Sequence, residues 1–84
     1  MQNNMPKWFK GMIYTEGAIV ENPLSKEEYE LNGHELSMYD YIMGTQLVME
    51  VAPKSVTPSQ VQDFRKAINW FRKNNAEAYM ALLD

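Results

Sequence analysis

Residues 32–50 read NGHELSMYDYIMGTQLVME, and this stretch decides the fold because it specifies a long helix. Asn32 is a favoured N-cap residue, and Glu35, three positions later, completes the pattern of a capping box. We therefore expect a helix over 33–50. With about 100° between successive residues, one face carries Leu36, Tyr39, Met43, Leu47 and Val51, and the other side carries Met38, Tyr41, Ile42, Val48 and Met49. A helix that is apolar on nearly all sides lies at the centre of a fold or is covered by a partner.

Two further helices are expected after this one. Thr57-Pro58-Ser59-Gln60 combines an N-cap, a proline at the first helical position and a glutamine that can bond back to the cap. The helix predicted from this start, over 58–73, has one apolar stripe, formed by Val61, Phe64, Ala67, Ile68 and Phe71. Asn75 can cap a short C-terminal helix over 76–83.

The chain before residue 32 predicts a β-hairpin over residues 18–31, with a turn that starts at Asn22-Pro23. Because a lone hairpin is marginal in water, we expect its apolar side (Ile19, Tyr29 and Leu31) to pack on a helix. Pro6 and Gly17 bracket a short N-terminal helix over about 6–15. Residues 1–5 are expected to be flexible, and residues 6–84 to form a single small α+β domain.

Composition excludes several classes of protein. The chain has 84 residues and a mass of 9.8 kDa, which is room for one small domain. It has no cysteine, so neither disulfides nor thiolate zinc sites can supplement the core. No apolar stretch reaches the roughly 20 residues that a membrane span needs, and the start of the sequence has no signal-peptide core. We expect a soluble protein without a membrane partner.

The candidate catalytic and metal-binding residues do not form recognised sites. His34-Glu35 begins the zincin pattern, but Met38 stands where the second histidine is required. Glu27, Glu28 and Glu30 lack the spacing and the glycine of a calcium loop. The serines stand in no strand–elbow–helix context, and there is no glycine-rich phosphate loop. We expect no enzymatic activity, no metal, no cofactor and no small-molecule ligand.

The excess of methionine and aromatic residues favours a protein-contact function. Seven Met, two Trp, five Tyr and three Phe occur in this short chain. Surfaces rich in these residues form adaptable protein contacts. The expected interaction surface consists of Met38, Tyr41, Val48, Met49 and Trp70. The leading hypothesis is a non-enzymatic protein-interaction module whose favoured partner is a second copy in a homodimer, with a self-sufficient monomer as the alternative.

A small nucleic-acid-associated regulator is the alternative function. The exposed face of the helix over 58–73 carries Gln62, Arg65, Lys66 and Asn69, which have the chemistry to touch phosphates or bases. The net charge of −3 argues against this hypothesis, because it gives the chain little electrostatic attraction to nucleic acid.

Three stretches of the sequence carry a family resemblance. Residues 21–25 (ENPLS), 29–31 (YEL) and 36–44 (LSMYDYIMG) resemble a group of small uncharacterised proteins of tailed bacteriophages, marine phages among them. Leu24 stands where that group has an aromatic residue, and Lys26 where it has a turn glycine. The resemblance implies a phage origin and no catalytic residue. With that origin, the interaction module is expected to be a phage accessory or virion-associated protein, located in the cytoplasm of a bacterial host.

The absence of a metal-ligand pattern predicts that the fold needs no metal. We expect the melting temperature to be the same with and without an excess of EDTA. A fall of several degrees in EDTA would contradict this and would identify the acidic residues between Glu27 and Glu35 as cation ligands.

Overall fold

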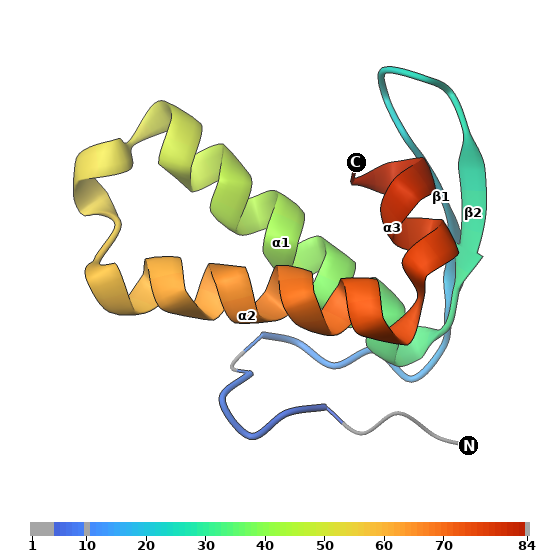
Figure 1. Ribbon diagram of the computed structural model, residues 1–84, viewed down its shortest axis with the longest axis horizontal. Coiled ribbons are helices and arrows are strands. Elements are labelled where there is room, and N and C mark those ends of the chain that lie inside the picture. The colour runs from blue at the N-terminus through green and yellow to red at the C-terminus, as the bar shows by residue number, and fades with distance from the viewer. Residues whose placement is uncertain (1–4, 10, 84) are drawn as a thin grey trace.

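The computed structural model describes residues 5–9 and 11–83 (Figure 1). In this part of the chain, a two-stranded antiparallel β-hairpin precedes the helices. The elements are β1 (Ala18–Glu21), β2 (Glu28–Leu31), α1 (Gly33–Val51), the short 3-10 helix η1 (Pro53–Ser55), α2 (Pro58–Asn74) and α3 (Ala76–Leu82). The predicted α+β class is confirmed. The ends of α1, α2 and α3 lie within one residue of their predicted positions.

The predicted N-terminal helix over 6–15 is wrong. Its described residues form one turn, closed by a bond from the Phe9 N–H to the Pro6 carbonyl at 3.1 Å, followed by non-helical chain. An isolated helix this short is marginal in water, and an internal glycine weakens it further. The Tyr14 N–H instead donates to the Ser37 hydroxyl in α1 at 2.7 Å. Apart from Met5, the expected flexible N-terminus lies outside the described residues.

The register of the β-hairpin corrects the predicted apolar side. Ile19 pairs with Glu30, and Val20 pairs with Tyr29. Residues directly opposite one another in an antiparallel pair point to the same face, so Val20, and not Ile19, lies on the inner face with Tyr29 and Leu31. Ile19 is 66% exposed on the outer face. The β1 sequence AIVE does not alternate between polar and apolar residues, so it left this register undecided.

The buried core lies at one end of the pair formed by α1 and α2. Leu31 of β2 joins Met38, Tyr39 and Ile42 of α1, and the remaining members are Ala67, Phe71, Ala78 and Leu82. All buried residues of α1 fall between Glu35 and Ile42, so its C-terminal half contributes none. Figure 1 shows the two helices together beside the β-hairpin and α3, and diverging toward η1. The molecule therefore has a closed end and an open end.

A buried carboxylate joins the elements of the closed end. Glu35 is 7% exposed, and one of its oxygens accepts from the Asn32 N–H at 3.0 Å, completing the predicted capping box. Its other oxygen accepts from the Asn75 side-chain amide at 3.1 Å. The side-chain amide oxygen of Asn75 in turn accepts from the Ala78 N–H at 3.1 Å and from the Tyr29 hydroxyl at 3.4 Å. The starts of α1 and α3 and the strand β2 are thus fixed to one another.

The predicted capping box of α2 is also confirmed and gives a stability prediction. The Thr57 hydroxyl accepts from the Gln60 N–H at 3.1 Å, and the Gln60 side chain accepts from the Thr57 N–H at 2.8 Å. We expect Thr57→Ala to lower the free energy of unfolding by about 1 kcal/mol, since it removes the acceptor for an N-terminal amide. Thr57→Ser keeps the hydroxyl and should keep most of the stability. An unchanged urea midpoint in Thr57→Ala would contradict the expectation.

Candidate functional site

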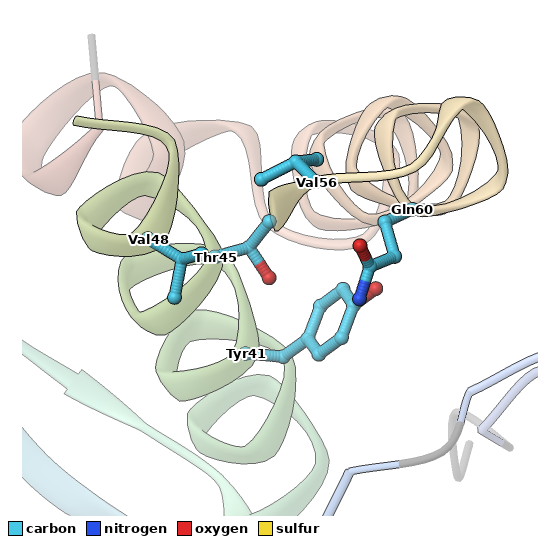
Figure 2. Close-up of a pocket in the computed structure, with 5 residues that line it drawn as sticks. All are labelled: Tyr41, Thr45, Val48, Val56 and Gln60. Atoms are coloured by element: carbon cyan, nitrogen blue, oxygen red, sulfur yellow. The ribbon is translucent and has the colours of Figure 1, made fainter. Parts of the chain in front are cut away.

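A small hollow opens between α1 and α2 where the two helices diverge. Tyr41, Thr45 and Val48 follow one another along α1, and Val56 and Gln60 face them across the gap, as Figure 2 shows. The hollow has a volume of about 100 Å³. Sites that bind small molecules usually enclose about 300–1,000 Å³. Its size therefore suits a side chain of a protein partner better than a free metabolite.

A three-ring cluster lies beside this hollow. Residues 5–9, which we call the arm, bring Trp8 and Phe9 against Tyr41, with ring centroids 6.4 and 5.5 Å from that of the tyrosine. The Lys66 ammonium of α2 lies 6.0 Å from the centre of the Trp8 ring, within the range of a cation–π contact. Burial raises the pKa of the Tyr41 phenol, and the nearby Asp63 carboxylate raises it further. Tyr41 thus contacts the arm and also forms a wall of the hollow.

Residues 14–17 are held to the fold by hydrogen bonds and by close packing of their backbone. Besides its N–H bond to Ser37, Tyr14 donates its hydroxyl to the Asp40 carboxylate at 2.9 Å, and this bond raises the pKa of the phenol. A Cβ added at Gly33 would lie 2.4 Å from the Tyr14 carbonyl oxygen, and one at Gly17 would overlap the Leu31 carbonyl. Glycine at these two positions lets the backbone of residues 14–17 approach α1 and β2. We call residues 14–17 the anchor.

The residues of the predicted interaction surface do not share one surface. Met38 has no exposed area and belongs to the core, so it drops out of that surface. Its position one turn before Ile42 turns it toward the packed side of α1. Tyr41 is half-buried beneath the arm, and Met49 and Trp70 are also half-buried. Of the predicted residues, the structure brings only Tyr41 and Val48 together, in the hollow.

Sequence reasoning identified only one residue, Val48, of an apolar surface at the end of α1. Leu47, Val48 and Val51, here named the α1-end surface, are 58, 41 and 73% exposed. The predicted interaction surface included Val48, whereas Leu47 and Val51 were assigned to the other face of the helix. Lengths could have shown the shortfall: the 19 residues of α1 span roughly 28 Å, whereas a four-residue strand spans roughly 13 Å.

Two other hollows lie near the β-hairpin. The first, of about 160 Å³, is lined by apolar and amide side chains: Asn22, Pro23, Leu24, Met43, Gln46, Leu82 and Leu83. The second, of about 490 Å³, has Glu27, Glu28 and Glu77 among its lining residues. The Tyr29 hydroxyl donates to Glu77 at 3.1 Å, which raises the pKa of the phenol. Within residues 5–9 and 11–83, no group of three or more His, Cys, Asp or Glu side chains is arranged to hold a metal ion.

Half of the basic side chains on α2 contact aromatic rings of the same chain. Lys66 lies over Trp8, and the Arg72 guanidinium lies 5.9 Å from the centre of the Tyr79 ring. Arg72 also donates to the Asn69 side chain at 2.8 Å. Arg65 and Lys73 are exposed. The face expected to meet phosphates is therefore partly engaged within the protein.

Comparison with known proteins adds no family assignment. No protein-family model matches the chain, and no curated protein or solved structure gives a match. The resemblance to phage proteins therefore stays a prediction. In the described part of the chain, no helix is both long and apolar enough to cross a bilayer.

A pair of glycines on α1 gives a test of the anchor. We expect Gly33→Ala to destabilise the protein, because the added Cβ lies 2.4 Å from the Tyr14 carbonyl and must displace the anchor. Gly44→Ala is the matched control, since a Cβ there meets nothing within 4 Å. It should stabilise the protein by up to about 1 kcal/mol through helix propensity. A rise in the urea midpoint of both variants would show that the anchor does not pack on α1 as described.

Proposed function

We propose that the protein is a non-enzymatic protein-interaction module that forms a homodimer through the α1-end surface. The observation that supports this is the exposure of Leu47, Val48 and Val51 together on the last two turns of α1. Contiguous exposed apolar patches on small proteins are often contact sites. A symmetric dimer buries the same patch from both copies at once.

Local charge favours a second copy at this surface. The chain has a net charge of −3, so two copies repel each other over most of their surfaces. Around the α1-end surface the nearest charged residues in sequence are Glu50 and Lys54, which are of opposite sign. These two charges offset each other, so the residues next to the α1-end surface in the sequence add no net charge that would oppose a second copy.

A nucleic-acid-associated regulator is the second candidate function. Its support is the exposure of Arg65 and Lys73 on α2. Its weakness is that Lys66 and Arg72 lie over the rings of Trp8 and Tyr79. Retention on immobilised DNA that falls steeply as salt rises would favour this candidate over the first. A role as a phage accessory protein rests on the sequence resemblance and is compatible with either.

Sedimentation equilibrium at micromolar concentration tests the proposed dimer. We expect the wild-type protein to sediment with twice its chain mass of 9.8 kDa. Val51→Asp should give the single-chain mass with unchanged circular dichroism, because it places a charge in the contact while the residue is 73% exposed in one chain.

Met80→Asp is the matched control. Met80 is 66% exposed but lies on α3, away from the α1-end surface, so this variant should remain dimeric. A wild-type mass of 9.8 kDa across the concentration range would refute the homodimer. A Val51→Asp protein that stays dimeric would refute the assigned surface.

A further inference from the structure

The arm is held in a different way from the anchor. Its described contacts with the rest of the fold are made by side chains: Trp8 and Phe9 contact Tyr41, Lys66 lies over Trp8, and Met5, Trp8 and Phe9 all pack against the core. Among the described residues, its one backbone–backbone hydrogen bond is internal, from Phe9 to Pro6. Segments that make few backbone hydrogen bonds to the rest of a fold open at lower free-energy cost than segments that make many.

The anchor allows the arm to leave without unfolding the core. Tyr14 is bonded to Ser37 and Asp40, and the backbone of residues 14–17 packs closely on α1 and β2. The capping box of α1 and the bonds of Asn75 do not involve the arm. Detachment of residues 5–9 therefore uncovers the ring of Tyr41 and the part of the core on which the arm packs, and it releases Lys66 from the Trp8 ring, while the hydrogen bonds of the anchor stay in place.

The surface beneath the arm, which we call the seat, includes Tyr41 and Lys66, and it adjoins the hollow at Tyr41. Tyr41 contacts the arm and also lines the hollow with Thr45, Val48, Val56 and Gln60 (Figure 2). The hollow of about 100 Å³ therefore lies next to the arm and shares Tyr41 with it, and no arm residue lines it. A segment that fills both the seat and the hollow buries more apolar area than the arm does, and this difference favours displacement of the arm.

We infer that the arm is a detachable cover, and that the seat beneath it binds a partner protein segment that presents two neighbouring aromatic side chains. The arm itself shows the chemistry that the seat accepts, which is a Trp-Phe pair in tilted and edge-on contact with Tyr41, with the Trp ring beside a lysine. Asp63 lies near the Tyr41 phenol and Lys66 lies over the Trp8 ring, so charged groups of both signs stand close to the aromatic contacts. The arm competes with this partner from a high effective concentration.

The test uses the full chain and a fluorescent synthetic peptide of residues 5–13 (MPKWFKGMI) as the probe. In the double variant Trp8→Ala/Phe9→Ala the seat is empty, and we expect saturable 1:1 binding of the peptide by fluorescence anisotropy. Wild-type protein should bind the peptide at least tenfold more weakly, because its own arm occupies the seat. Replacing Tyr41 by Leu in the double variant should abolish binding.

Each remaining outcome counts against the inference. A double variant that fails to fold shows that the arm is part of the core and not a cover. If the folded double variant does not bind the peptide saturably, or if wild-type protein binds the peptide equally well, the proposed seat is refuted. The dimer surface and the hollow share Val48, but the probe peptide reproduces the arm, whose rings contact Tyr41, and Val51 does not line the hollow. Val51→Asp should therefore leave peptide binding unchanged, so loss of the proposed dimer and loss of the seat are separate results.

Discussion

The hydrogen bonds of the Glu35 carboxylate hold the fold together. This group is almost fully buried, so its two oxygens must be satisfied within the protein. One accepts from Asn32 at the start of α1, and the other accepts from Asn75 at the junction of α2 and α3. Asn75 also accepts from Tyr29 of β2. Two side chains, Glu35 and Asn75, therefore fix where the β-hairpin, the first long helix and the last helix meet.

The division of the molecule into a closed and an open end follows from this arrangement. The β-hairpin and α3 are short, and the polar network gathers both around the start of α1. The core forms there, around Phe71 and Met38. The second half of α1 extends beyond these elements, so Leu47 and Val51 remain exposed and the hollow beside Val48 remains open. Both proposed contact surfaces lie toward this less covered part of α1.

Local signals predicted much of the fold, and contacts between distant residues account for what they missed. The capping box of Asn32 and Glu35 lies within four neighbouring residues, so the local sequence predicted it together with the start of the helix that follows. The bond from Asn75 to Glu35 spans 40 positions and has no local pattern. The exposure of Ile19 depends on strand register, and the burial of Met38 depends on which elements reach α1. For the same reason, periodicity identified α1 as apolar on two sides but misplaced the exposed part of it.

A double-mutant cycle on Glu35→Ala and Asn75→Ala tests this account most directly. Loss of the α3 cap and of the Tyr29 contact occurs in Asn75→Ala whether or not Glu35 is present, so both effects cancel in the cycle. The account predicts a coupling of about 1–2 kcal/mol in the free energy of urea unfolding, as expected for a hydrogen bond to a buried carboxylate. Free energies of the two single variants that add to within about 0.3 kcal/mol in the double variant would contradict it.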